Sequence, residues 1–278
     1  MDEREKDVVL FESESEETAE IKIVKLSECA MSNIGIRNLE LNGGSIAPTE
    51  EKEHKIEFIG DSITCGYGVD DEDPTHSFST ATEDCTKAYA YKTAEKLDAD
   101  YSLVSISGYG IISGYTANPE NIVDNQTIPP YYETLGFCYN TFANGERPSD
   151  IAWDFAKFTP DCIVINLGTN DASYCNTQEK MDTFAAAYTE FLKTIRENNP
   201  DAKIFCTLGI MGANLYPSIE YAVYNYTEET GDDNIVCVQF ENQQSADGLA
   251  ADYHPTEATH EKASDLLVEA INTEMGWS

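Results

Sequence analysis

The sequence predicts an α/β fold with three layers, in which helices cover both faces of a five-stranded parallel sheet. Three observations support this prediction. Apolar, β-branched segments recur from residue 55 onward, segments of helical periodicity separate them, and several of the apolar segments end at glycine and polar residues. Strands that are apolar along almost their whole length are typical of a parallel sheet buried on both faces.

The five predicted strands are short and rich in isoleucine, valine and phenylalanine, which favour extended backbone. We expect them at residues 55–60, 102–107, 162–167, 203–208 and 234–240. The clearest helix is Gln178–Asn198, because its apolar residues fall on one stripe at helical spacing. A last helix is expected from about residue 256 to residue 274, ahead of Gly276.

Residues 8–43 predict three short strands of a different kind. Residues 8–11 form an apolar run, and residues 21–26 and 38–41 alternate between apolar and polar side chains. Alternation buries one face of a strand, and three short strands cannot shield that face without a partner layer. Residues 47–53 then read as a charged linker with one proline. We therefore divide the chain into a partial β-sandwich with its linker, 1–48, and a main domain, 55–278.

The composition excludes two classes of partner. The 278 residues include 17 basic and 51 acidic side chains, which gives a formal net charge of −34. Such a surface repels nucleic-acid phosphates and anionic lipid heads, so we expect no nucleic-acid and no membrane partner. A neutral or cationic substrate is favoured. The oligomeric state is left open.

The eight cysteines predict neither a disulfide scaffold nor a metal site. They are irregularly spaced, several lie inside apolar runs, and no C-x-x-C pair occurs. No apolar stretch reaches transmembrane length, and the first ten residues lack a signal-peptide pattern. We therefore expect either an intracellular protein or one whose leader has been removed.

Four segments whose residues could take part in catalysis follow predicted strands or precede the last helix. They contain Ser62, Gly108, Asn170 and His254. Because the carboxyl ends of parallel strands meet at one edge of a sheet, we expect these residues to lie together. Taken singly, Ser62 also fits a helix N-cap, Gly108 a tight turn and Asn170 a cap or turn residue.

Histidine is the side chain best suited to deprotonate a serine hydroxyl near neutral pH. The chain has four: His54 in the linker, His76 in an acidic loop, His254 before a proline, and His260 in the last helix. We expect His254 to be the base, His76 to be a solvated loop residue and His260 to lie on the helix surface. The acidic run 70–73 lacks the spacing and glycine of an EF-hand, so we interpret it as a solvated loop rather than a calcium site.

The order G-D-S, glycine, G-x-N-D and D-x-H-P resembles the SGNH hydrolases, also called GDSL esterases, over about residues 55–275. The G-x-S-x-G elbow of the α/β-hydrolases is absent around Ser62. Residues 55–68, 107–111 and 252–255 look very like carbohydrate esterase family 2. That resemblance implies a flavodoxin-like SGNH domain preceded by a jelly-roll β-sandwich, of which residues 8–43 resemble only the last strands.

The resemblance also implies roles for the four segments. Ser62 is the expected nucleophile and His254 the base. The expected oxyanion donors are the main-chain N–H groups of Ser62 and Gly108 and the side-chain amide of Asn170. No metal or other cofactor is needed. The wider group carries its acid three residues before the histidine. Here Asp252 lies two residues before it, so Asp252 is expected to orient His254 either through its carboxylate or through its main-chain oxygen.

The resemblance implies a secreted serine esterase that removes O-acetyl groups from plant cell-wall polysaccharides such as xylan and glucomannan. Four tyrosines near the expected site are predicted to contact the sugar, because aromatic faces stack on sugar rings: Tyr67, Tyr109, Tyr216 and Tyr253. The alternative for each is a core position. Two other functions stay open: a GDSL lipase or thioesterase acting on other acyl esters, and a carbohydrate-binding protein with a vestigial active site.

Overall fold

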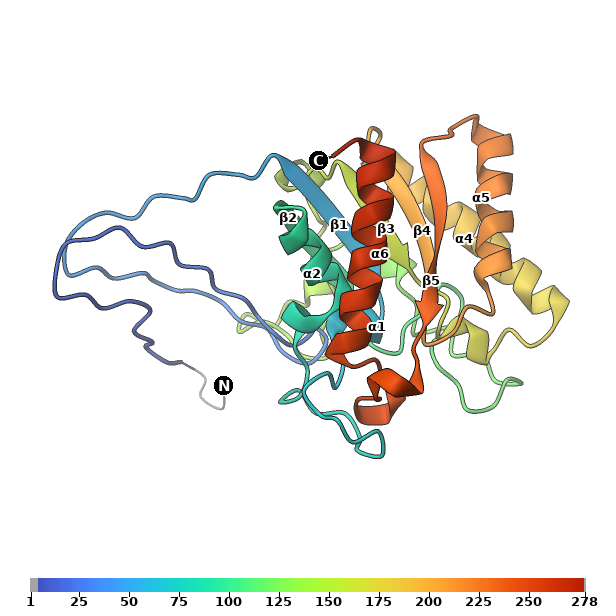
Figure 1. Ribbon diagram of the computed structural model, residues 1–278, viewed down its shortest axis with the longest axis horizontal. Coiled ribbons are helices and arrows are strands. Elements are labelled where there is room, and N and C mark those ends of the chain that lie inside the picture. Colours follow the sequence, from blue (N-terminus) through green and yellow to red (C-terminus); the bar gives the residue numbers. More distant parts are fainter. Residues whose placement is uncertain (1–4, 278) are drawn as a thin grey trace.

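Five parallel strands form one sheet in the computed structural model, which describes residues 5–277 (Figure 1). The strand order is β2-β1-β3-β4-β5, so the chain starts in the interior of the sheet and extends it in both directions. Loops that leave neighbouring strands in opposite directions open a crevice at the carboxyl edge. The strands are β1 His54–Gly60, β2 Ala99–Ser105, β3 Cys162–Asn166, β4 Lys203–Ile210 and β5 Ile235–Asn242.

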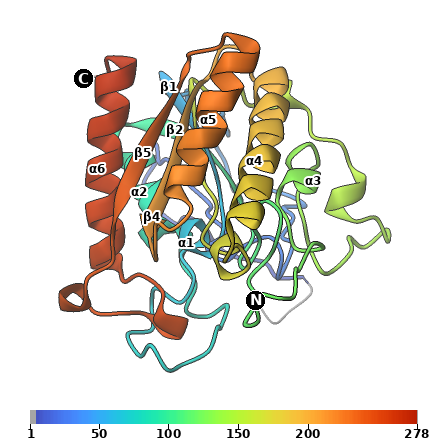
Figure 2. The same cartoon turned by 90° about the vertical axis from the view of Figure 1, so that its right-hand side faces the viewer.

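Helices cover both faces of this sheet, as Figures 1 and 2 show. One buried cluster contains residues of α2 and α6, and a second contains residues of α4 and α5. The two clusters lie on opposite sides of the sheet, which confirms the predicted three-layer α/β/α fold. The helices are α1 Ser62–Cys65, α2 Tyr89–Lys96, α3 Pro129–Tyr132, α4 Gln178–Asn198, α5 Tyr216–Thr230 and α6 Glu257–Met275.

The bounds of the elements agree closely with the sequence prediction. Helix α4 has the predicted limits, because Thr177 caps it by accepting a hydrogen bond from Lys180 N and its apolar stripe is buried. Helix α6 ends at Gly276, which adopts a left-handed conformation with φ 69°. Strand β2 ends at Ser105, two residues earlier than predicted, which leaves Gly108 in the loop beyond the sheet.

The position of His260 corrects one prediction. Its imidazole is fully buried between α6 and α2, where Nδ1 accepts a hydrogen bond from Tyr89 N at 3.2 Å. The prediction of a helix-surface residue is therefore wrong, because this turn of α6 faces α2 and not the solvent. Burial lowers the pKa of His260 to about 3.

The predicted N-terminal strands are also wrong for this structure. Within residues 5–53 the structure contains neither a helix nor a regular strand, and this part of the chain runs far out from the sheet before β1 (Figure 1). Its apolar side chains, such as those of Val9, Ile36 and Leu41, are largely exposed. The physical reason is the one that limits isolated strands generally: without neighbouring strands and a covering layer, alternating segments have nothing to pair with.

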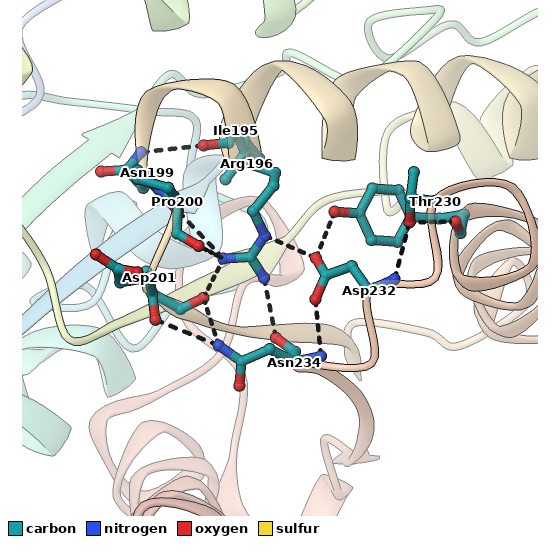
Figure 3. Close-up of polar contacts among 10 residues, drawn as sticks. Ile195, Arg196, Asn199, Pro200, Asp201, Thr230, Asp232 and Asn234 are labelled. Atoms are coloured by element: carbon teal, nitrogen blue, oxygen red, sulfur yellow. Dashed lines mark hydrogen bonds and ion pairs between the residues drawn. The ribbon is translucent and has the colours of Figure 1, made fainter.

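A guanidinium cluster at the opposite edge from the expected site ties α4 to the starts of β4 and β5 (Figure 3). Arg196 Nε donates to Asp232 Oδ2 at 2.7 Å, and Nη1 donates to the carbonyls of Asn199, Pro200 and Ala202. A planar guanidinium with five donors suits such a set of acceptors, which lysine could not satisfy. The cluster stabilises the amino edge of the sheet, and the candidate site lies at the carboxyl edge.

Two further observations concern disulfide bonds and membrane-spanning helices. All eight cysteines are free, and six of them are buried among the core residues. Within residues 5–277, no helix is both long and apolar enough to cross a bilayer.

Candidate active site

Ser62 is the first residue of α1, directly after β1. Asp61 is the N-cap, and its Oδ1 accepts a hydrogen bond from Ile63 N at 3.0 Å, so the interpretation of Ser62 as a cap is wrong. A Cβ atom at Gly60 would collide with the side chain of Thr64, so this sharp exit from the strand requires glycine. The turn places Ser62 at the carboxyl edge of the sheet with its N–H in the first turn of a helix, where no intrahelical acceptor exists.

His254 lies against Ser62 although 192 residues separate them. The imidazole Nε2 is 2.9 Å from Ser62 Oγ, and Nδ1 is 3.2 Å from each of the main-chain oxygens of Ala251 and Asp252. Carbonyl oxygens only accept, so Nδ1 carries the hydrogen and Nε2 is free to accept the serine proton. Burial lowers the pKa of His254 to about 4, which keeps the imidazole neutral at ordinary pH.

The Asp252 carboxylate makes its hydrogen bonds away from the imidazole. Its Oδ2 accepts from Tyr67 OH at 2.6 Å and from Phe78 N at 3.1 Å. Tyr67 in turn stacks on the His254 ring, with centroids 4.0 Å apart. Of the two ways in which Asp252 was expected to orient His254, this geometry has the main-chain oxygen at the imidazole and the carboxylate holding the aromatic ring behind it.

The chain bends sharply just before His254. Asp252 and Tyr253 both have left-handed backbone, with φ of 50° and 62°. Such conformations are strained for residues other than glycine, at about 1–2 kcal/mol each. The neighbouring acidic loop holds them in place, because Ala251 N donates to Asp71 O and Asp252 N donates to His76 O, both at 2.9 Å. The main chain of residues 71–76 thus supports the histidine loop.

Gly108 forms the turn that follows β2. Its φ of 81° is left-handed, and a Cβ atom there would meet open space, so the backbone conformation and not crowding favours glycine. The Gly108 carbonyl accepts from Tyr115 N at 2.9 Å. Within residues 5–277 the Gly108 N–H has no protein acceptor, which leaves it free to donate to a ligand.

Asn170 follows β3 and is buried beside Asp61. Its Nδ2 donates to Tyr109 O at 2.9 Å and to Asp61 Oδ2 at 3.2 Å. It starts a short turn but makes no side-chain capping bond, so the cap interpretation is not supported. Through these two bonds the Asn170 amide joins the loops that follow β1, β2 and β3. Burial raises the pKa of Asp61 to about 7.

The structure separates the four predicted tyrosines. Tyr109 is only 3% exposed, and its ring packs against Tyr131 and Phe137, so the prediction that it lines the site is wrong. Tyr67 stacks on the imidazole. Tyr216 is the first residue of α5 and is half-buried against the core. Tyr253 is 57% exposed next to His254, which leaves its ring available to a ligand.

Residues 58–262 match the GDSL-like Lipase/Acylhydrolase family. A solved structure of a family two carbohydrate esterase from Clostridium thermocellum, in complex with cellohexaose, is 33% identical in sequence and superposes with a TM-score of 0.70. That similarity covers 84% of this chain and 68% of the other. The chain belongs to carbohydrate esterase family 2, within the GDSL-like hydrolases.

Two curated relatives of this family 2 chain are larger proteins. The cellulase/esterase CelE of Acetivibrio thermocellus is 33% identical over 258 residues, which are 91% of this chain and 30% of that protein. An acetylxylan esterase/glucomannan deacetylase of Cellvibrio japonicus is 28% identical over an alignment of 283 positions, which spans 100% of this chain and 73% of that protein. The chain thus spans less than a third of the first relative.

The site of this family 2 chain includes two buried acids that sequence reasoning did not select. Asp61 joins the serine turn to Asn170. Asp171 accepts hydrogen bonds from Ile111 N, Ile112 N and Ser113 N at 2.8–3.0 Å and so holds the loop after Gly108. Burial raises the pKa of Asp171 to about 6, against these three donors. Asp61 lies in the G-D-S motif and Asp171 in the G-x-N-D motif, and this position could have identified both acids from the sequence.

Proposed function

We propose that this chain is a serine esterase that removes O-acetyl groups from plant cell-wall polysaccharides through an acyl-enzyme on Ser62. The observation that carries the proposal is the 2.9 Å contact between His254 Nε2 and Ser62 Oγ, with Nδ1 facing main-chain carbonyls. A serine beside a neutral, oriented imidazole is the arrangement that acyl transfer requires.

The reaction follows from which atoms can give and take a proton. His254 Nε2 takes the Ser62 Oγ proton as Oγ bonds to the acetyl carbonyl carbon and the carbonyl oxygen becomes an oxyanion. The tetrahedral intermediate then breaks its bond to the sugar oxygen, which receives the proton from His254. Water repeats the cycle: it loses a proton to His254, attacks the acyl carbon and releases acetate with Ser62 restored.

Three donors are proposed for the oxyanion: Ser62 N, Gly108 N and Asn170 Nδ2. The Gly108 N–H has no acceptor within the described chain, and Ser62 N lies in the first turn of α1. The Asn170 amide is held by two acceptors, of which the Asp61 bond is the longer at 3.2 Å. We expect the oxyanion to take the hydrogen of this longer bond, because the longer contact is the weaker of the two.

Three observations support an acetylated glycan as the substrate. Relatives are named acetylxylan esterase/glucomannan deacetylase, and one solved structure holds cellohexaose. Tyr253 presents an exposed ring beside His254, suited to stacking on a sugar. The net charge of −34 favours a neutral polymer over an anionic lipid surface. Since such polymers are extracellular, the proposal includes a secreted or cell-surface location.

Acetate release tests this function. Purified protein is incubated with acetylated glucomannan and acetylated xylan, and acetate is measured enzymatically. We expect release from both, and a preference for nitrophenyl acetate over nitrophenyl octanoate. A preference for octanoate would favour a lipase or thioesterase instead. If no acetate is released while cello-oligosaccharides bind, a carbohydrate-binding role replaces the esterase.

The rate should persist to unusually low pH. His254 acts as a base only when neutral, and burial lowers its pKa to about 4, so kcat/KM for nitrophenyl acetate should reach its plateau near pH 5. An imidazole with the ordinary pKa of about 6.5 would give half the plateau rate only at about pH 6.5. Below about pH 6.5 the histidines become protonated in the unfolded chain but stay neutral where the fold buries them, so the free energy of unfolding falls. Circular dichroism at each pH therefore serves as the control for folding.

Asp252→Asn should lower kcat by no more than about 10-fold. The carboxylate contacts Tyr67 and Phe78 N, and the main-chain oxygen that faces the imidazole is unaffected by the substitution. Where a carboxylate itself holds the imidazole, the same replacement costs about 10⁴ in kcat. Steady-state kinetics with nitrophenyl acetate distinguish the two, and a loss of that larger size would assign the orienting role to the side chain.

The division of the chain remains a proposal. We propose that residues 1–48, although residues 5–48 form no regular strand in this structure, belong to a β-sandwich, and that residues 55–278 form the hydrolase domain. The exposed apolar side chains of residues 8–46 support this, because they suit pairing with further strands.

A further inference from the structure

One short part of the N-terminal region docks on the hydrolase domain, and we call residues 25–31 the docking segment. Cys85 N donates to Leu26 O at 3.1 Å, and Tyr139 N donates to Ala30 O at 3.0 Å. The Ala30 side chain is buried in the core cluster that contains Ile106. Most of the surrounding residues from 5 to 53 are exposed, so this segment is the buried anchor of the region, and Lys22 adds hydrogen bonds to Tyr91 and Glu95 at the surface.

The Glu28 side chain is the part of the docking segment that contacts the candidate site. Its side chain is only 6% exposed, and Oε2 accepts a hydrogen bond from Ser107 N at 2.9 Å. Its main-chain N–H donates to Glu83 Oε2 at 3.1 Å, which fixes the backbone from which the side chain projects. Ser107 directly precedes Gly108, so the carboxylate touches the turn that presents the proposed oxyanion donor.

The peptide group between Ser107 and Gly108 is held on both sides. Glu28 takes the N–H before it, and Tyr115 N donates to the Gly108 carbonyl after it at 2.9 Å. The N–H between these two contacts is the one without an acceptor within the described chain. A left-handed glycine has broad conformational freedom, so the direction of this N–H depends on the contacts on either side.

We propose that Glu28 is a positioning residue that aims the Gly108 N–H at the oxyanion, by accepting the Ser107 N–H. The inference rests on the proposed esterase function. It means that residues outside the hydrolase domain complete the site: the acceptor that orients the turn comes from the docking segment, before β1.

The surroundings of Glu28 allow a neutral replacement. Glu83 is 2% exposed, and within residues 5–277 the Oε1 atoms of Glu28 and Glu83 have no hydrogen-bond partner. Burial raises the pKa of both carboxyls, that of Glu83 to about 8, with the Cys65 thiol beside them and the Lys25 ammonium the nearby cation. A glutamine at position 28 keeps an oxygen for Ser107 N and places an amide toward Glu83.

Two conservative variants test the role of the acceptor against the role of the charge. Glu28→Gln keeps the acceptor in place and removes the charge. Glu28→Asp keeps the charge and withdraws the acceptor by one methylene, about 1.5 Å. We expect the kcat for nitrophenyl acetate to stay within about threefold for the first and to fall at least about 10-fold for the second, with KM little changed, because a displaced donor weakens only transition-state binding.

A loss of stability alone must be separated from this effect. Ile271→Val removes a buried methyl group in α6, away from the site, and should lower the melting temperature without changing kcat per folded molecule. Full activity of Glu28→Asp, or equal losses in both Glu28 variants, would overturn the positioning role while the wild-type esterase stands. An inactive wild-type chain would instead refute the proposed function.

Discussion

Ser62→Ala should abolish acetate release, with kcat lower by about 10⁴–10⁶. Within the described residues the Ser62 hydroxyl is the hydrogen-bond partner of His254 Nε2, at 2.9 Å, and without it no acyl-enzyme forms. Acetate from acetylated glucomannan and nitrophenol from nitrophenyl acetate both measure the loss. Because the change removes one oxygen from a residue whose Cβ remains, the fold and the melting temperature should stay close to wild type.

The matched control for this prediction is the double variant. His254→Ala should lose activity to a similar degree, and Ser62→Ala combined with His254→Ala should lose little more, because the two side chains act as one unit. Multiplying losses would indicate that they act independently. Equal, slow acetate release by wild type and Ser62→Ala would show that the site does no acyl transfer, and the binding-protein alternative would then account for the family resemblance.

Asn170→Ala should lower kcat by about 10²–10³ and leave KM nearly unchanged. Loss of one oxyanion donor typically has this effect, because the hydrogen bond strengthens only as charge develops in the transition state. The substitution also frees Tyr109 O and Asp61 Oδ2 from a buried donor, at about 1–3 kcal/mol of stability. Kinetics should therefore be measured well below the melting temperature.

Asn166 offers a matched control for that variant. It lies at the end of β3, is fully buried, and within the described residues its amide has no hydrogen-bond partner. Asn166→Ala makes the same chemical change four residues earlier and should leave kcat within a few-fold. If the two variants lost equal activity, or if Asn170→Ala lost less than 10-fold, Asn170 would be a structural bridge between loops and not an oxyanion donor.

The elements and the four site positions could be predicted because their signals are local. An apolar run of β-branched residues identifies a buried strand, and the glycine or acid at its end identifies the turn. Once the sheet is parallel, those turns share one edge, and Ser62, Gly108, Asn170 and His254 meet without any knowledge of packing. The limits of α4 and α6 follow equally from the Thr177 cap and from Gly276.

Side-chain direction was harder to predict, because it depends on neighbours that are distant in sequence. His260 lies on a helix whose periodicity allows it to face either α2 or the solvent. Tyr109 flanks the turn at Gly108, yet its ring packs into the core and only its carbonyl reaches Asn170. The strands expected in residues 8–43 need pairing partners that alternation alone does not supply.

The sequence by itself determined the sheet, its order of motifs and the serine–histidine pairing, since each depends on spacing along the chain and on the shared edge of parallel strands. Only the tertiary structure decided how the histidine is held. Two left-handed residues turn the main-chain oxygens of Ala251 and Asp252 toward the imidazole, while the Asp252 carboxylate holds Tyr67 and Phe78 N. Backbone direction at such a bend is set by the loops packed around it, and no residue pattern encodes those contacts.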